Sequence, residues 1–391
     1  MANIENILLK YASKASEDNK VLSAAFIVKG KGGKTICSSA AGSLKFEGDE
    51  PFTEDSVCWI ASMTKLVTAI AAMQVVEKGM VGLDDDLGKI VPDLSDLQVL
   101  DGFDDNGKAI LTKATKAVTL RHLLTHSSGF GYDSWDSDLV KWRQSIGSEL
   151  NSNSFSYESL KIPLKFQPGE GWLYGIGIDW AGQVIQKLTG QSLEDYMQEN
   201  IFQPLGMTST TFRITDHPEL QSKRADMGLR PEPGRPLTRG EAFKPDVTSM
   251  DCGGVGLYST AKDYGRLLGA LLDGGGGILK SDSVHQLYQS QLPDPKYLEE
   301  NLFGDFYPVF SPEYPKGSAI NYGLGGALNL DDIPERRRAG SVMWTGATNP
   351  RWWLDPKAGV AAALMVQVFP PADSVVSELY AELEKAVYEQ L

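Results

Sequence analysis

Both ends of the chain carry the same pattern, in which a helix with one apolar face lies next to two apolar runs separated by a turn. At the N-terminal end, apolar residues recur at helical spacing over 3–17, and the runs 22–30 and 36–43 flank the turn KGGKT. At the C-terminal end, two runs flank the turn DPKAG and precede an amphipathic stretch; these segments are 349–354, 360–368 and 374–390. The two ends therefore predict one antiparallel sheet with terminal helices packed on it.

The middle of the chain has helical periodicity instead, and several of its segments close on a glycine, as helices often do. The polar stretches between these segments predict loops, at 100–117, 133–157 and 216–250. Because 391 residues exceed the size at which a single core keeps growing, we expect two lobes. The first is an α/β lobe built from residues 1–60 and 250–391, and the second is a mainly helical lobe, 61–249, inserted into it.

The composition is that of an ordinary globular protein, with 42% hydrophobic and 23% charged residues. The formal net charge of −14 argues against nucleic acids and anionic membrane surfaces as partners, because both require a basic face. The 3 cysteines lack CxxC spacing and predict neither a disulfide framework nor a structural zinc site. Residues 1–20 lack the apolar core of a signal peptide, and no apolar run reaches the length of a membrane span, about 18 residues. We therefore expect a cytoplasmic protein.

A serine three residues before a lysine occurs twice, as Ser62-Met-Thr-Lys65 and as Ser259-Thr-Ala-Lys262, and the surrounding residues separate the two. The stretch after the first pair, LVTAIAAMQVVEKG, is apolar on nearly every face, which is typical of a buried helix. The first turn of that helix would hold Lys65 beside Ser62, where a buried ammonium is costly and the amine becomes a candidate proton acceptor. The free N–H groups at the helix start lie near the same serine, and together these features favour nucleophilic acyl transfer.

The second pair precedes an amphipathic helix, where Ser259 or Thr260 is expected to cap the helix and Lys262 to lie on the solvated face. The same capping role is the alternative for Ser62.

Two further features weigh against a capping role for Ser62. Tyr174 lies in the glycine-rich stretch GWLYGIGIDWAG just before a predicted helix, from which its phenol can reach a cleft. Thr345, Gly346 and Ala347 follow an apolar run at the predicted sheet edge, where small residues let a substrate lie against the strand and the Ala347 N–H can donate to an oxyanion. Each feature also has a simpler interpretation, a core tyrosine and an ordinary turn, so the evidence is their combination.

The order Ser62-Met-Thr-Lys65, the motif at Tyr174 and then Trp344-Thr345-Gly346 resembles the pattern of serine β-lactamases and penicillin-binding proteins. TLRHLLTHSSGF and CGGVGLYST resemble its class C branch, which is shared with family VIII carboxylesterases. Within that branch, WLYGIGIDWAG, INYGLGG and LDPKAG resemble the fungal lovastatin-type acyltransferases (transesterases), over roughly residues 20–390. The resemblance implies a β-lactamase/transpeptidase-like α/β fold, with an antiparallel sheet flanked by helices and an inserted, mainly helical lobe.

The resemblance also implies roles for single residues. It makes Ser62 the nucleophile, Lys65 its proton acceptor and Tyr174 a partner base and acid, with the N–H groups of Ser62 and Ala347 as the oxyanion hole. The order in which Lys65 and Tyr174 act stays open, because a tyrosinate beside an ammonium and a phenol beside a neutral amine both fit. No cofactor and no metal are implied.

Two departures from the β-lactamase pattern point away from penicillins. Where the family has an asparagine two residues after the tyrosine this chain has Ile176, and Trp344 replaces the lysine at the head of the last motif. Both changes remove polar groups that would hold a β-lactam, so we expect a more apolar site. The residues expected to bind substrate are Ile176, Trp344, Thr345 and Gly346. Trp352 and Trp353 are further candidates, although at least one of them is expected to pack within the sheet.

His122 and His126 stand four residues apart, a spacing that can hold a metal, but no HExxH glutamate lies between them. We expect both to be structural and to pack near the cleft. No GxSxG motif occurs, which disfavours an α/β-hydrolase.

Three functions stay open. The first is transfer of an acyl group from an ester or thioester to an alcohol of a secondary metabolite, through an acyl-enzyme on Ser62. The second is a carboxylesterase, or a lactone or amide hydrolase, with the same site, and the third is a binding protein that kept the fold without catalysis. The expected partners are a small-molecule ester or thioester, together with an alcohol acceptor or an acyl-carrier donor.

Overall fold

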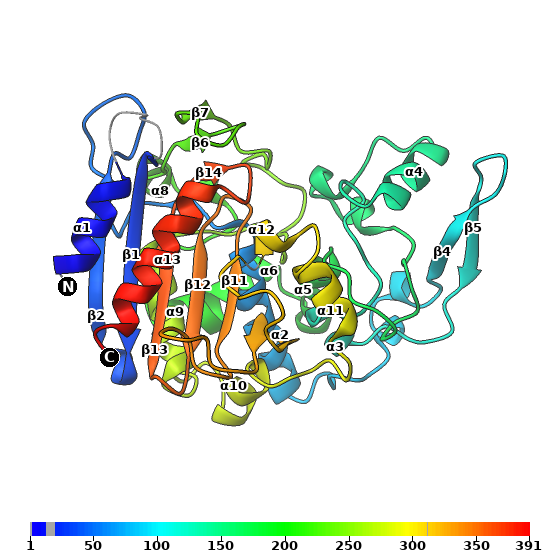
Figure 1. The fold of residues 1–391 in the computed structure, drawn as a ribbon. Helices are drawn as coiled ribbons and strands as arrows, with labels where there is room; N and C mark the ends of the chain where they lie inside the picture. The colour runs from blue at the N-terminus through cyan, green and yellow to red at the C-terminus, as the bar shows by residue number, and fades with distance from the viewer. Residues whose placement is uncertain (1, 13–19, 311) are drawn as a thin grey trace.

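A computed structural model of the chain describes residues 2–12, 20–310 and 312–391. Its main sheet has seven strands in the order β2-β1-β13-β12-β11-β10-β9, and neighbouring strands are antiparallel (Figure 1). The strands are β1 (Ser23–Gly30), β2 (Thr35–Gly42), β9 (Ile320–Tyr322), β10 (Ala327–Asn329), β11 (Val342–Thr345), β12 (Arg351–Asp355) and β13 (Val360–Met365). The sheet thus joins segments from both ends of the chain, as the hydrophobic pattern predicts.

Helices cover both faces of this sheet. On one face lie α1 (Ala2–Tyr11) and α13 (Ser374–Tyr388), side by side, and on the other α9 (Ala261–Leu272) packs against β1 and β13 (Figure 1). The ring of Trp353 in β12 meets Tyr380 of α13 edge-on, with 5.5 Å between the centroids. The apolar faces predicted for the two terminal helices are therefore the faces buried in the fold.

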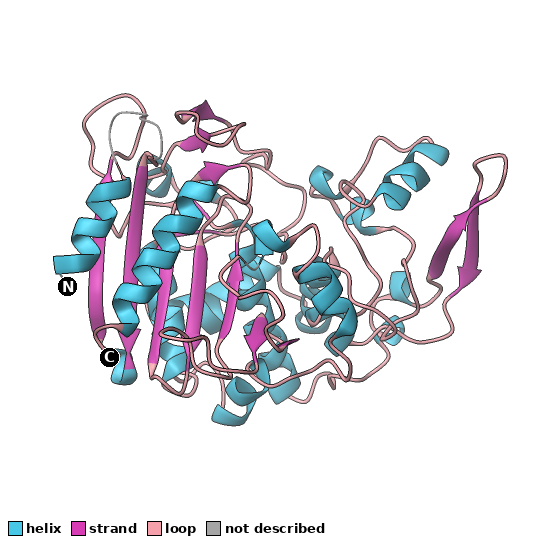
Figure 2. Cartoon of the chain, in the orientation of Figure 1, coloured by secondary structure: helices cyan, strands magenta, loops and turns pink. Residues whose placement is uncertain are grey.

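Helices and loops predominate beyond β9, on the right of Figure 2. The central helix of this part is α2 (Thr64–Glu77), whose residues 64–75 are all buried, which explains why its sequence is apolar on nearly every face. It packs against α5 (Gly177–Thr189), α6 (Leu193–Met197) and α10 (Ser281–Leu287). The other α-helices of the described residues are α3 (Leu120–Leu124), α4 (Ser137–Ser145), α7 (Gln203–Leu205), α8 (Pro218–Ser222), α11 (Lys296–Leu302) and α12 (Tyr307–Phe310).

Several sequence-based boundaries were wrong. The first helix ends at Tyr11, well short of residue 17, and residues 13–17 of that prediction lie outside the described part of the chain. The three predicted loops also contain regular structure: β4 (Gln98–Phe103) and β5 (Ala109–Lys113) in the first, α4 in the second, and α8, β6 (Met227–Leu229) and β7 (Thr238–Gly240) in the third.

These elements escaped prediction for physical reasons. The β4–β5 hairpin projects from the body at the right of Figure 1, and most of its residues are at least partly exposed, so no apolar alternation marks it. The short strand β6 is held instead by pairing with β7 and with the distant strand β14 (Val368–Phe369).

A second small sheet, of β3 (Cys58–Trp59) with β8 (Tyr258–Ser259), joins the segment before α2 to the segment before α9. The division into lobes 1–60 with 250–391 and 61–249 stays a prediction. Among the described residues, no helix is both long and apolar enough to cross a membrane.

The buried ion pair on α13 yields a stability prediction. Glu384 is fully buried and receives two arginines from the segment between β10 and β11: Arg337 Nε lies 2.7 Å from one oxygen and Arg336 Nη1 lies 3.3 Å from the other. Substituting Glu384→Gln leaves Arg337 buried without its counter-ion, so we expect the free energy of unfolding to fall by about 3–5 kcal/mol. Guanidinium unfolding measures this loss.

Glu382→Gln is the matched control. Glu382 lies on the same helix as Glu384 and forms an exposed ion pair with Lys10 of α1, so this substitution is expected to change stability little. Equal losses in the two variants would contradict the prediction.

Candidate active site

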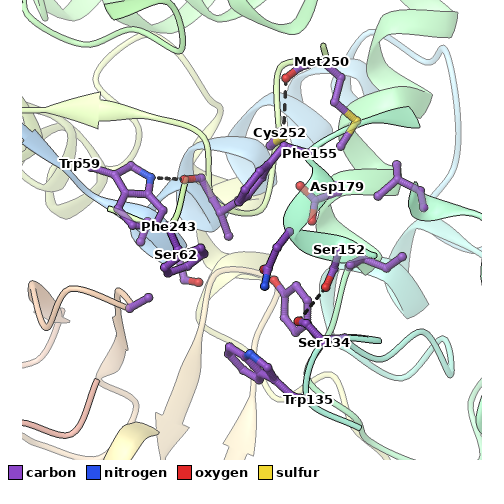
Figure 3. A pocket seen from close by; sticks show the side chains of 17 residues that line it. Trp59, Ser62, Ser134, Trp135, Ser152, Phe155, Asp179, Phe243, Met250 and Cys252 are labelled. Carbon is purple, nitrogen blue, oxygen red and sulfur yellow. Dashed lines mark hydrogen bonds between the residues drawn. The ribbon is translucent and has the colours of Figure 1, made fainter. Parts of the chain in front are cut away.

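Ser62 lies in a single 3-10 turn, Ala61–Met63, that connects β3 to α2. The preceding residue, Ala61, is buried and has a φ of 45°, in the left-handed region that residues with a side chain rarely adopt. This conformation redirects the chain between strand and helix, and the Ser62 side chain faces a pocket (Figure 3). The sequence predicts that Ser62 opens the helix, and in the structure Ser62 lies in the turn just before α2.

Lys65 lies in the first turn of α2 and is almost completely buried, with 2% of its surface exposed. Its Nζ has three hydrogen-bond partners, one from each of three segments: Ser62 Oγ at 3.1 Å, Tyr132 OH at 3.1 Å and the carbonyl oxygen of Gly254 at 2.8 Å. A carbonyl only accepts, so one N–H points to Gly254. A neutral amine would donate a second N–H to Tyr132 and direct its lone pair at Ser62, which is the arrangement of a nucleophile beside its base.

Two tyrosines approach this amine, and they do so differently. Lys65 Nζ lies 4.6 Å from the centroid of the Tyr174 ring, so the amine faces the ring rather than the hydroxyl. The Tyr174 hydroxyl accepts a hydrogen bond from Trp344 Nε1 at 3.2 Å. The role of Tyr174 as partner base and acid stays a prediction, whereas the hydroxyl that is bonded to Lys65 is that of Tyr132.

Tyr132 and Asp179 are site residues that the sequence analysis missed. Burial raises the pKa of Tyr132 well above its ordinary value, and Tyr174 and Asp179 add to the rise, so its hydroxyl stays protonated. Asp179 is buried beside the same pocket, and its Oδ1 accepts the Gly254 N–H at 2.9 Å. Sequence signals for both exist: Tyr132 follows the signature TLRHLLTHSSGF by two residues, and Asp179 is a lone acid in the otherwise apolar stretch GIGIDWAG.

The end of β11 lies against the Ser62 turn. A Cβ on Gly346 would come within 2.6 Å of the Ile60 carbonyl oxygen, so only glycine allows this approach. Pairing with β10 involves Val342 and Met343 and stops before Thr345, whose Oγ1 donates to Pro350 O at 3.1 Å. Ala347 and Ser62 line the same pocket, and the oxyanion hole assigned to their N–H groups stays a prediction.

The three tryptophans considered as possible substrate contacts, Trp344, Trp352 and Trp353, do not line the pocket at Ser62. Trp344 is 1% exposed and lies behind Tyr174, where it supports the phenol rather than lining either cavity next to Ser62. Trp352 and Trp353 are both fully buried within the sheet, so packing explains both and not only one of them. Ile176 does line the pocket with Ser62.

Two neighbouring cavities share the walls Tyr132 and Trp135, and Ser62 lines one of them. The first contains Ser62, and its apolar walls include Phe155, Leu160, Ile176, Met250 and Val255. Figure 3 shows Asp179 and Cys252 facing this space from the side away from Trp135. The second cavity is mainly aromatic, and its walls include Trp172, Tyr174, Phe306 and Phe310.

Of the two histidines in the stretch RHLLTH, His126 is buried and His122 is half-buried. His126 lies among the rings of Trp172, Tyr174 and Tyr322, and desolvation lowers its pKa well below the ordinary value, with the Lys65 charge adding to the effect. Within the described residues, no group of three or more His, Cys, Asp or Glu side chains is arranged to hold a metal, and the three cysteines are free and buried.

The second Ser-x-x-Lys pair has the structural role predicted for it. Thr260 caps α9 by accepting the Asp263 N–H at 3.1 Å, and Lys262 pairs with Asp55 near the surface.

A family model described as beta-lactamase matches residues 10–387 of the chain. Monacolin J acid methylbutanoyltransferase from Aspergillus terreus is 34% identical over 389 residues, which cover 96% of this chain and 94% of that protein. Lovastatin esterase from Penicillium rubens is also 34% identical, over 345 residues that cover 86% of this chain and 85% of that protein. The solved structure of unliganded simvastatin synthase (LovD) from Aspergillus terreus superposes with a TM-score of 0.88 at 30% identity, covering 100% of this chain and 97% of that one.

The hydrogen bond between Tyr132 and Lys65 leads to a prediction about the reactivity of Ser62. Tyr132→Phe removes one partner of a buried amine and frees it to turn away from Ser62, so we expect a fluorophosphonate to label Ser62 about tenfold more slowly. The labelling rate is read from intact mass over time. Tyr314→Phe removes a buried hydroxyl that donates to Ala327 O, remote from Ser62, and should label at the wild-type rate. Wild-type labelling of Tyr132→Phe would show that this hydroxyl does not align Lys65.

Proposed function

This chain belongs to the beta-lactamase family, and we propose that it transfers an acyl group from an ester or thioester to an alcohol of a secondary metabolite, through an acyl-enzyme on Ser62. The family match and the likeness to simvastatin synthase confirm the predicted family and the β-lactamase/transpeptidase-like fold. The names of the relatives likewise confirm the predicted class, a serine acyltransferase or esterase of this superfamily.

The observation that carries the proposal is the contact between Lys65 Nζ and Ser62 Oγ at 3.1 Å in a buried position. In the first half of the reaction, Ser62 Oγ attacks the acyl carbon while its proton moves to Lys65. The oxyanion that forms is stabilised by N–H donors, for which Ser62 and Ala347 are our candidates. When the bond to the leaving alkoxide or thiolate breaks, that group takes the proton from Lys65, which leaves acyl-Ser62 and a neutral amine.

The second half runs in reverse with an alcohol as the attacking group. The alcohol gives its proton to Lys65 and bonds to the acyl carbon, and Ser62 Oγ leaves and recovers a proton from Lys65. Tyr132 keeps the amine aligned throughout, and Tyr174, which borders the second cavity, is our candidate for relaying the proton of the incoming alcohol.

The two cavities support a reaction with two substrates. We assign the acyl chain to the apolar cavity that holds Ser62, and the acceptor to the aromatic cavity behind Tyr132 and Trp135. The name of the Aspergillus relative specifies a methylbutanoyl group, a short apolar chain of the kind that such apolar walls favour. Apolar Ile176 in the wall favours such a chain over a β-lactam amide. An acyl-carrier donor and a cytoplasmic location stay predictions.

Hydrolysis is the second candidate function, because a relative of the same identity is named an esterase. The machinery is common to both reactions, and they differ only in whether water or an alcohol removes the acyl group.

Intact mass tests the acyl-enzyme directly. With a short acyl thioester or a nitrophenyl ester, wild type is expected to gain one acyl mass, and Ser62→Ala to gain none. Ser259→Ala is the matched control, since it changes the other Ser-x-x-Lys pair, and it should acylate like wild type. If wild type shows neither added mass nor turnover, and a fluorophosphonate leaves Ser62 unlabelled, the remaining hypothesis is a non-catalytic binding protein. Product analysis with and without an alcohol then separates transfer from hydrolysis.

The assignment of the acceptor cavity makes its own prediction. Phe306 lines the aromatic cavity at its partly exposed mouth, so Phe306→Ala should raise the KM for a bulky alcohol about three- to tenfold, through lost apolar contact. The rate of Ser62 acylation should not change. Phe303→Ala, in the same segment but outside the cavity walls, is the control. An effect on acylation rather than on the alcohol would place the donor in this cavity.

A further inference from the structure

The turn 252–255 is held in place by four side chains. Thr68 Oγ1 donates to Gly253 O at 2.6 Å, Lys65 Nζ to Gly254 O at 2.8 Å and Trp59 Nε1 to Val255 O at 2.7 Å. The fourth is Asp179 of α5, whose Oδ1 accepts the Gly254 N–H at 2.9 Å. This turn therefore links a carboxylate on one side to the amine of Lys65 on the other.

Asp179 is fitted closely to this position. It is 4% exposed, and a Cβ on Gly254 would lie 2.5 Å from its Oδ2, so the carboxylate packs directly against the glycine backbone. Burial raises the pKa of Asp179, while the Lys65 charge and the Gly254 N–H oppose that rise and favour the carboxylate.

Other titratable side chains lie around Lys65, but none of those discussed next supplies a negative charge that could take the place of the Asp179 carboxylate. Burial raises the pKa of Tyr132 and of Cys252 well above their ordinary values, which keeps both protonated, and it lowers the pKa of His126 well below its ordinary value, which keeps the imidazole neutral. Tyr174 presents its ring to the amine. Among the described residues, this leaves Asp179 as the carboxylate that faces Lys65.

We propose that Asp179 is a positioning residue for the acyl transfer: it fixes Gly254 so that its carbonyl holds Lys65 against Ser62, and it balances the charge that Lys65 gains from the Ser62 proton. The nucleophile, its base and an orienting acid are then connected by hydrogen bonds in the order Ser62–Lys65–Asp179. The link between Lys65 and Asp179 is the backbone of Gly254, whose carbonyl accepts from Lys65 and whose N–H donates to Asp179. A third group that orients the base is a general requirement of activated nucleophiles. This inference rests on the proposed acyl-enzyme at Ser62.

Asp179→Asn tests the charge, because the amide oxygen can still accept the Gly254 N–H. The carboxylate stabilises the ammonium that Lys65 becomes when it takes the Ser62 proton, and the neutral amide does not. We therefore expect Ser62 acylation by a short nitrophenyl ester to be about 10- to 100-fold slower. When the acylation rate is measured from about pH 5 to pH 9, the acid limb of the pH–rate profile should lie about one pH unit lower than in wild type. The KM for the ester should stay close to that of wild type.

The matched control is Glu194→Gln. Glu194 is equally buried, accepts the Phe212 N–H at 2.7 Å and has a pKa raised by burial, but it lies outside the pocket walls. Its loss should lower the unfolding temperature without moving the acid limb. The proposal is overturned if Asp179→Asn acylates like wild type with the same limb, or if both variants shift the limb equally.

A second variant approaches the same contact from the other side. Gly254→Ala keeps the charge but pushes the carboxylate away, so acylation should slow while the acid limb moves less than in Asp179→Asn. This variant decides the question if Asp179→Asn does not fold, and wild-type acylation by Gly254→Ala then overturns the proposal. Absence of any acyl mass on wild type is a different result: it refutes the proposed function, and this inference with it.

Discussion

The site depends on the burial of one amine. Lys65 sits in a helix whose residues 64–75 are all buried, and a polar group in such a place is tolerated only with hydrogen-bond partners. Its partners come from three separate segments, at Ser62, Tyr132 and Gly254. The central helix therefore cannot pack favourably unless these segments meet around Lys65. The contact that makes the core stable is also the contact that places our candidate base, Lys65, beside our candidate nucleophile, Ser62.

The demand for close contact explains the small residues around the site. Because one partner of Lys65 is main chain, the backbone has to approach it, and Gly254 has no room for a Cβ beside Asp179. Gly346 meets the Ile60 carbonyl in the same way, and Ala61 takes a left-handed conformation between strand and helix. Small residues thus let the main chain of separate segments meet next to Ser62 and Lys65.

Sequence reasoning succeeds here where the chemistry is local. Ser62 and Lys65 are three residues apart, so helical spacing alone brings them together, and the apolar helix behind them indicates burial. Tyr132 and Gly254 lie 67 and 189 residues from Lys65, and their contacts depend on how α2, α5 and the turn 252–255 pack, which no local pattern specifies.

The same distinction holds for the fold. Strands buried on both faces, such as β1 and β13, were evident as apolar runs, because burial selects the residue type at every position. The β4–β5 hairpin is mostly exposed and β6 is only three residues long, so neither leaves an apolar period. Trp344 was assigned to the substrate site from its place in a motif. A motif specifies the backbone position, whereas the packing of Tyr174 and Phe310 around the indole decides where the side chain goes.

The aromatic surroundings of Lys65 bear on the choice between water and an alcohol. The Tyr174 ring contacts the rings of Trp172, Phe310 and Trp344, at centroid distances of 6.5, 4.7 and 5.3 Å, so the wall of the aromatic cavity at Tyr174 offers few polar groups to water. An acyl-enzyme there reacts with whichever hydroxyl is held near Lys65, and an apolar alcohol gains contact with these rings that water cannot. Relatives named a transferase and an esterase are equally identical to this chain, so the difference between the two outcomes need not involve Ser62 or Lys65. With the acceptor in the aromatic cavity, as we propose, we expect the outcome to depend on how long that cavity retains the acceptor relative to the lifetime of the acyl-enzyme.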